Sequence, residues 1–281
     1  MYFQLLDKNG RESVMGNMDF TLRTYKKLIE SFLNKGYVVQ PFEDYLTNPV
    51  EDKVLILRHD VDELAGNALK MARLENELGV RATYFFRIVK QSNVPEIITE
   101  IKELGHEIGY HYEDLALANG DFEKAITTFK EHLEYFRRYY PVKTVCMHGS
   151  SASKFDNRLL WGKYNLSDFQ IIGEPYITLD FSKIFYITDT GYCWDGGKVA
   201  VRDHVDSFWD LSFHTSDEII ESSELPEQIM MLAHTLWTDS IVQWMMLHLR
   251  EFLRNNVKQI AKNNRFVAKY YEKFVKLYWS K

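Results

Sequence analysis

The stretch Val54-Leu55-Ile56-Leu57-Arg58-His59-Asp60-Val61-Asp62 places two carboxylates directly after an aliphatic run. The run at 54–57 has the uninterrupted apolar character of a short strand buried in a parallel sheet. Successive side chains of an extended chain point to opposite faces, so Asp60 and Asp62 are expected to point the same way. Two like charges in one space are unfavourable unless a cation or a proton lies between them. Solvated loop acids or helix N-caps are the alternative, but the place after a strand favours one acid for a metal and one for proton transfer.

Strand-like and helical patterns alternate along the first half of the chain. Strands are expected at 37–39, 54–57, 80–88, 106–111 and 142–147, and helices at 18–34, 64–78, 96–104 and 122–140. Polar clusters follow several of these strands. This pattern is typical of an α/β fold, either a parallel barrel or an open parallel sheet, with its site at the carboxyl ends of the strands.

The second half of the sequence is less regular. Strands are expected at 170–173, 184–187, 198–201 and 229–233, followed by a long helical region from about residue 239. No repeat or linker divides the chain. We therefore expect a single domain over 1–281, with a core at about 50–240 and a helical C-terminal extension at 241–281.

Composition narrows the classes of function. The 281 residues carry a formal net charge of -6, and the pI near 5.9 argues against nucleic acid as the main partner. Cys146 and Cys193 are the only cysteines, too few for a disulfide framework. The N-terminal residues lack the pattern of a signal peptide, and no apolar run is long enough to cross a bilayer. A cytoplasmic location is expected.

Two histidine clusters follow strands in the first half. His111 precedes Tyr112-Glu113-Asp114, and a histidine beside two acids is an ordinary place for a divalent cation. His148 precedes Gly149-Ser150, where it is either a ligand or oxyanion group, or only part of a Gly/Ser turn. The local sequence does not decide between these alternatives.

Two further clusters lie in the second half. Asp189 ends a strand-like segment, and with Trp194 it could form a pocket wall whose aromatic face supports a sugar ring. His234 ends an apolar strand, with Trp237 three residues later. Since the ordinary pKa of histidine lies near neutrality, His234 is the best candidate for a general acid.

In this order the motifs resemble those of the polysaccharide deacetylases, the NodB-type carbohydrate esterase family 4. The resemblance covers residues 54–237. It rests on four segments of the chain: Asp60-Val61-Asp62, Gly79-Val80-Arg81-Ala82-Thr83-Tyr84-Phe85, Gly105-His106-Glu107-Ile108-Gly109-Tyr110-His111 and Leu232-Ala233-His234. Singly these are moderate signals, but their order and spacing together are specific.

The resemblance implies a distorted (β/α) barrel and metal-assisted hydrolysis of an acyl group on a sugar, with zinc as the expected divalent metal. It implies that Asp60 is the general base and that His234 protonates the leaving amine. Asp62 and His111 would be metal ligands. Ser150, Asp189, Trp194 and Trp237 are expected to contact the substrate.

The chain departs from the family pattern at three places. The second metal histidine of the family corresponds to Leu115, so Glu113, Asp114 or His148 must substitute, or the site is weak or absent. The arginine that braces the base in the family's third motif is missing, and Arg58 is expected to take its role. Thr235 follows His234 where proline is usual. With these departures the chain resembles a divergent branch of the family, and this resemblance implies sugar modification in O-antigen, capsule or other surface-glycan synthesis.

The expected substrate is an acylated amino sugar, either a nucleotide sugar or a lipid-linked sugar on the inner face of the membrane. One alternative is a non-catalytic protein that binds carbohydrate or nucleotide sugars on a degenerate deacetylase scaffold. Another is a metal-independent amidohydrolase that uses Asp60 and His234 alone. Finally, the basic and aromatic segment 265–281 is expected either to contact the inner membrane peripherally or to pack against the barrel.

Overall fold

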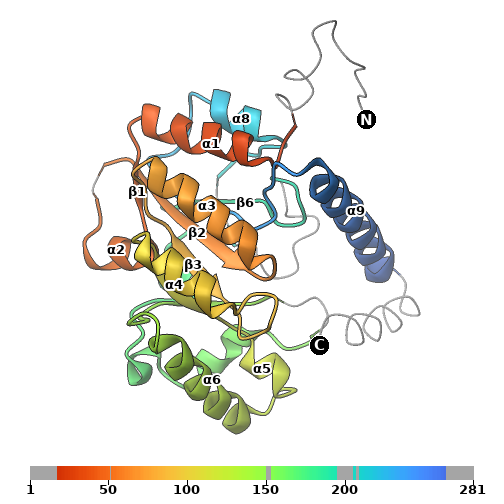
Figure 1. Ribbon diagram of the computed structural model, residues 1–281. Coiled ribbons are helices and arrows are strands. Elements are labelled where there is room, and N and C mark those ends of the chain that lie inside the picture. Colours follow the sequence, from red (N-terminus) through yellow and green to blue (C-terminus); the bar gives the residue numbers. More distant parts are fainter. Residues whose placement is uncertain (1–17, 51, 150–152, 195–204, 207–208, 264–281) are drawn as a thin grey trace, which may run out of the picture.

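Parallel strands form a curled sheet in the computed structural model, which describes residues 18–50, 52–149, 153–194, 205–206 and 209–263 (Figure 1). The strands of this part are β1 (Val38–Gln40), β2 (Val54–Val61), β3 (Thr83–Phe86), β4 (Glu107–Tyr112), β5 (Val145–Met147), β6 (Phe185–Thr188) and β7 (Gln228–Leu232). Their order is β5-β4-β3-β2-β7-β6, and β1 pairs with β2 beside this path. In the described residues no pairing joins β5 to β6, so the sheet is a half-barrel.

The long strand β2 lies at the centre of the sheet. Its first half pairs with β1, where Val38 is opposite Val54, and its second half pairs with β3, where Arg58 is opposite Thr83. On its other side β2 pairs with β7, where Arg58 is opposite Leu232. All these pairs are parallel, so the carboxyl ends of β2, β3, β4 and β7 meet at one side of the sheet.

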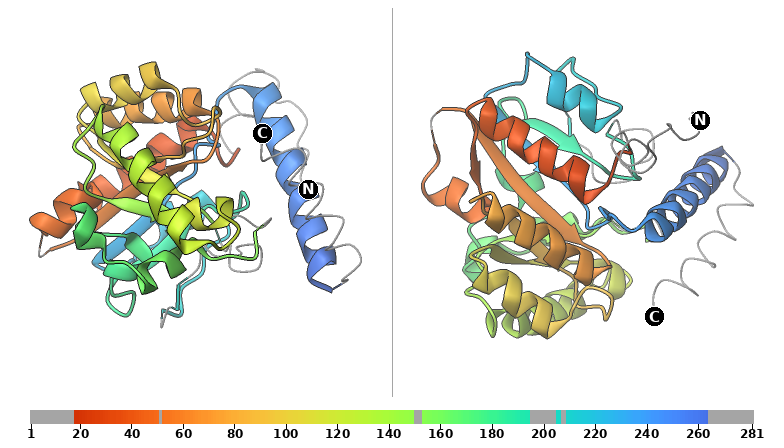
Figure 2. Two further views of the ribbon diagram at one scale, coloured as in Figure 1. Left: turned by 90° about the horizontal axis from the view of Figure 1, so that it is seen from below. Right: turned by 45° about the horizontal axis from the view of Figure 1, so that its top comes forward.

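Helices cover the outer face of the sheet, as the two views in Figure 2 show. The helices are α1 (Leu22–Asn34), α2 (Phe42–Thr47), α3 (Ala65–Glu77), α4 (Pro95–Glu103), α5 (Asp114–Leu117), α6 (Phe122–Arg137), α7 (Pro175–Thr178), α8 (Ser216–Glu221) and α9 (Ile241–Asn263), with short 3-10 helices at Asn157–Gly162 and Leu166–Phe169. Within the described residues, none of these helices is both long and apolar enough to cross a membrane.

Side-chain alternation along β2 separates two environments. Leu55 and Leu57 belong to the large apolar core under the helices, whereas Ile56 belongs to a smaller cluster on the inner, concave face. Arg58 and Asp60 continue the inner series, and both are buried. The period of two therefore delivers a charged pair into the interior of the half-barrel at the carboxyl end of β2.

A buried polar cluster joins the outer face of β2 to the helices. The His59 ring lies 2.8 Å from a Glu75 carboxylate oxygen through Nε2 and 2.8 Å from the Ala233 carbonyl through Nδ1. Tyr25 and Tyr84 donate their hydroxyls to the same carboxylate. Both ring nitrogens of His59 thus face acceptors, so the ring links the Glu75 carboxylate to the backbone after β7.

Most elements lie where the sequence pattern predicts them, with boundaries displaced by a few residues. Strand β2 extends through Val61, so Asp60 is inside the strand and not after it. The strand expected at 170–173 is wrong: the segment follows a 3-10 helix, and Gly173 forms only an isolated bridge with Thr144. The strand expected at 198–201 and the last part of the C-terminal helical region, 264–281, lie outside the described residues.

Candidate active site

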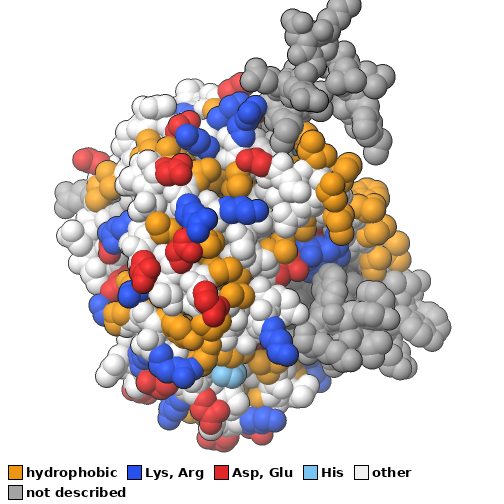
Figure 3. Space-filling model, viewed as in Figure 1, with side chains coloured by type: hydrophobic (Ala, Val, Ile, Leu, Met, Phe, Trp, Pro, Cys, Tyr) orange, Lys and Arg blue, Asp and Glu red, His pale blue; other side chains and the backbone are white. Residues whose placement is uncertain are grey.

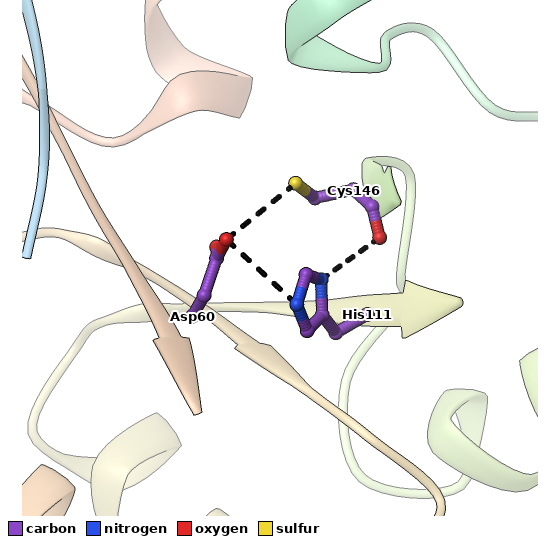
Figure 4. Close-up of side chains that lie close together, drawn as sticks. All are labelled: Asp60, His111 and Cys146. Carbon is purple, nitrogen blue, oxygen red and sulfur yellow. Dashed lines mark hydrogen bonds and ion pairs between the residues drawn. The ribbon is translucent and has the colours of Figure 1, made fainter. Parts of the chain in front are cut away.

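Inward-facing side chains from three strands converge at the carboxyl end of the half-barrel (Figure 4). Asp60 on β2, His111 on β4 and Cys146 on β5 are all buried. The Nε2 atom of His111 lies 3.7 Å from Asp60 Oδ2, and the Cys146 sulfur lies 4.0 Å from the same oxygen. Gly109 leaves room on this face, because a Cβ atom there would lie 2.3 Å from the Phe85 ring.

Asp62, His111 and His148 form a second group, which shares His111 with the first. The ligand atoms of this group lie close enough together to hold a metal ion. Asp62 Oδ1 lies 3.3 Å from His111 Nε2 and 3.4 Å from His148 Nε2. Ligands about 2.0–2.1 Å from a tetrahedral zinc ion are separated from one another by about 3.3–3.4 Å. The oxygen is buried and accepts no geometrically satisfactory hydrogen bond, so a cation would complete its coordination.

Hydrogen bonds hold both histidine rings in the orientation that a metal ligand requires. His111 Nδ1 donates to the Cys146 carbonyl at 3.0 Å, and His148 Nδ1 donates to Glu113 at 3.0 Å. These bonds occupy Nδ1 as a donor, so Nε2 is the ring nitrogen that faces Asp62 and would bind a metal. Metal-ligating histidines are commonly oriented in this way by an acceptor on the other ring nitrogen.

Glu113 therefore contacts the cation site only through His148. Its other oxygen accepts two hydrogen bonds from Arg87, at 2.6 and 3.0 Å. Burial would raise the pKa of Glu113, but His148 and Arg87 outweigh it and lower the pKa to about 2. Arg87 also donates to the Asp62 carbonyl at 3.4 Å, which joins the loop after β2 to the same network.

Electrostatics favours the Asp62 group over the Asp60 group as the place for a cation. The Asp62 carboxylate faces His148 and His111, and although burial opposes it, their charges and that of Arg87 hold the pKa of Asp62 well below its usual value. Beside Asp60, by contrast, lies the buried guanidinium of Arg58, 2.6 Å from the Cys146 sulfur. That fixed positive charge opposes a metal ion between Asp60 and Cys146.

Arg58 lies under Asp60 in the half-barrel interior. One of its nitrogens is 3.7 Å from Asp60 Oδ2 and donates to the hydroxyls of Tyr176 and Tyr186 at 2.6 and 3.3 Å. Although burial alone would lower the pKa of Arg58, Asp60, Cys146 and the two tyrosines raise it well above the usual value. The guanidinium is thus a permanent charge next to the Asp60 carboxylate.

His234, two residues after the end of β7, is held by Asp189. The Asp189 carboxylate accepts the His234 Nδ1 proton at 2.6 Å, the His234 backbone N–H at 2.9 Å and the Trp237 indole N–H at 2.9 Å. Burial would lower the pKa of His234, but Asp189 above all, with Asp62 and Asp60, raises it to about 10. The ring is therefore protonated at neutral pH, as a proton donor must be.

The aromatic platform expected from the sequence differs from what the structure shows. Trp194 is buried, stacks on Phe20 and donates to Ser216, and Trp237 is completely buried. Neither ring presents a face to a substrate, because both are buried against Phe20. Asp189 likewise holds His234 and is not an exposed pocket wall, while Ser150 lies outside the described residues.

Two other residues of the histidine motifs have structural roles. Leu115, at the position of the missing histidine, is completely buried in the core. Asp114 accepts hydrogen bonds from Tyr110 and from His132 and takes no part in the cation groups found in the described residues. His148 is thus the residue that joins Asp62 and His111.

Sequence reasoning missed Arg87, Cys146, Tyr176 and Tyr186. Cys146 could have been found, because it lies in β5 two residues before His148, and alternation along an extended chain would turn both side chains to one face. Arg87 follows β3 directly and could have been included with the other strand-end polar residues. Tyr176 and Tyr186 come from the irregular region, where no periodicity indicates which side chains point inward.

Comparisons with known proteins find similarity only among solved structures, and that similarity is low. No family model matches the chain, and no curated protein matches it. A solved structure of a family 4 carbohydrate esterase from Bacillus anthracis is similar at 17% sequence identity and a TM-score of 0.36. The similarity covers 84% of this chain and 92% of that one.

Proposed function

We propose that the protein is a metal-dependent hydrolase that removes an N-linked acyl group, acetyl or formyl, from a sugar. The observation that carries the proposal is the convergence of Asp62, His111 and His148 beside the buried carboxylate of Asp60. Two imidazole nitrogens and a carboxylate oxygen suit zinc and related divalent ions. When bound, such an ion would polarise the acyl carbonyl and lower the pKa of the attacking water.

The side chains around the cation site divide the proton transfers between them. Asp60 faces the site and is free on Oδ1, so it takes the proton that water loses on attack. Arg58 holds the Asp60 carboxylate by its charge. His234, protonated and oriented by Asp189, gives its proton to the leaving nitrogen, since an amine is a poor leaving group without one.

The substrate class is supported by the order of the sequence motifs, which resemble those of the polysaccharide deacetylases. An acylated amino sugar, carried on a nucleotide or on a lipid, is the proposed substrate, in the synthesis of a surface glycan. A non-catalytic sugar-binding protein is the alternative that Leu115 suggests. Three converging donors and a protonated His234 support the hydrolase, because a binding protein needs neither.

The test measures metal content and acyl release together. The purified protein is assayed for bound metal and for acetate or formate released from acylated amino sugars, before and after chelation and after zinc is restored. Activity that disappears with the metal and returns with it is expected. A protein that binds metal and amino sugar but releases no acid would support the non-catalytic alternative. Full activity in the presence of a chelator would show that the reaction does not use a cation.

A further inference from the structure

Helix α9 turns its apolar side away from the protein. It stands at the edge of the molecule in both views of Figure 2. Its most exposed described side chains are apolar, and each of the following is more than half exposed: Val242, Met245, Met246, Leu249, Phe252 and Leu253. Figure 3 shows orange side chains gathered along this helix. We refer to these six residues as the outer face of α9.

The polar side of α9 faces the protein instead. Glu251 is buried, His248 packs on Tyr192, and Asn255 donates to the Gly191 carbonyl at 2.8 Å. A surface helix normally places its apolar stripe inward and its charges outward. Because α9 has the opposite arrangement, its outer face is suited to an apolar partner.

Charge identifies the chemistry of that partner. From residue 241 to the C-terminus the sequence carries nine Lys or Arg and two Glu, a balance of +7 in a chain whose total is -6. The remaining 240 residues therefore carry -13. A second copy of α9 would bring the same positive charge, and so would residues 264–281, with five basic residues and one acid. An anionic partner is favoured over both.

We infer that the outer face of α9 docks on an anionic lipid membrane, with its apolar side chains among the acyl chains and the positive charge of the C-terminal region attracted by the headgroups. An amphipathic helix with apolar residues on one side and excess Lys and Arg binds the interface of anionic bilayers in this manner. Basic and aromatic residues continue from Arg265 to Lys281, so the same chemistry extends beyond the helix. The proposal goes beyond the hydrolase activity and does not depend on it.

The contacts that attach α9 to the rest of the protein lie close to the candidate site. Arg250 forms an ion pair with Glu63, which directly follows Asp62. Asn255 bonds to Gly191, two residues after Asp189. Docking through the outer face thus brings the carboxyl ends of the strands close to the lipid headgroups.

The experiment is co-sedimentation of the full-length protein with vesicles. Vesicles of phosphatidylcholine alone are compared with vesicles of equal parts phosphatidylcholine and phosphatidylglycerol. Binding to the anionic vesicles only is expected, and it should weaken as salt is added. The M246E/L249E double variant should bind at least about tenfold more weakly, since two large side chains lose their transfer into the bilayer. The L117E/L159E variant adds the same charges at exposed apolar positions of α5 and a 3-10 helix, and it should bind as the parent does.

Three results would overturn the inference. The intact protein could fail to bind anionic vesicles, or the M246E/L249E variant, shown to be folded by thermal unfolding, could bind them as well as the parent. Light scattering could instead show a dimer that this variant converts to a monomer, without vesicle binding, which would assign the outer face to a second copy. None of these measurements uses the hydrolase activity, so the two proposals fail independently.

Discussion

The Nδ1 atom of His148 lies 3.0 Å from a Glu113 carboxylate oxygen, and this contact turns the other ring nitrogen toward Asp62. The acid two residues after His111 therefore orients a histidine that follows another strand, β5. His148 thus offers a third donor beside Asp62 and His111 at the candidate metal site, which the buried Leu115 cannot do.

Replacing Glu113 by Gln should weaken metal binding without abolishing it. The amide still offers an acceptor to His148, but the charge that strengthens the hydrogen bond and pairs with Arg87 is lost. We expect the affinity for zinc to fall about 10–100-fold, with one ion bound per chain at saturation. Competition with a chelating dye measures both quantities. H148A should lose far more affinity, and loss of stoichiometric binding in E113Q would instead make Glu113 a direct ligand.

The D60N substitution should separate proton transfer from metal binding. The amide cannot accept the proton from water, so kcat for acyl release should fall about 10²–10⁴-fold while metal content stays that of the parent. Steady-state kinetics and metal analysis on the same sample check this. D217N, at an exposed position of α8, serves as the matched control. A D60N enzyme with parental kcat would exclude Asp60 as the base.

The D189N substitution should move the alkaline limb of kcat/KM to lower pH. Asp189 is the main reason that the pKa of His234 is raised to about 10, and without its charge that pKa should return toward the ordinary value. The proton donor is then lost at a lower pH. A pH–rate profile of the parent and D189N enzymes gives the two limbs, and coincident limbs would count against His234 as the acid.

The same substitution should lower stability in a definite range of pH. A histidine whose pKa is raised on folding contributes stability that is complete below about pH 6.5 and is lost as the pH rises through about 10. At neutral pH we expect D189N to unfold with about 3 kcal/mol less free energy. Urea titrations at several pH values should show that the difference narrows above about pH 10.

Glu75 provides a stability test away from the candidate site. Burial opposes its ionisation, but His59, His106 and Tyr25 together lower the pKa of Glu75. A carboxylate with a lowered pKa contributes stability above its unfolded value, and this is lost as the pH falls through the folded value. E75Q should therefore cost about 3–5 kcal/mol at neutral pH and less in acid, measured by urea unfolding. E77Q, at the exposed end of the same helix, should cost almost nothing.

Sequence patterns predicted the strands and the site residues that depend on local periodicity. The aliphatic run of β2 and the alternation of Asp60 and Asp62 follow from the chain alone, because each strand places its side chains by a period of two. Which of His148 and Glu113 lies beside Asp62 could not be predicted, since it depends on the pairing of β4 with β5. The burial of Trp194 and Trp237 depends on their contacts with Phe20, which is far away in the sequence, and no local pattern contains that information.

The pairing of β2 with β7 has a consequence for how the protein is made. β2 is complete at residue 61, but its partner is synthesised only at residues 228–232. During translation the middle of the sheet therefore has an open edge, flanked by the apolar side chains of Leu55 and Leu57, and open edges invite aggregation. Chains that end at residue 225 and are released from the ribosome should need a chaperone to stay dispersed, whereas released chains that end at residue 263 should not. Dispersion of the shorter chain without help would show that the edge is protected in another way.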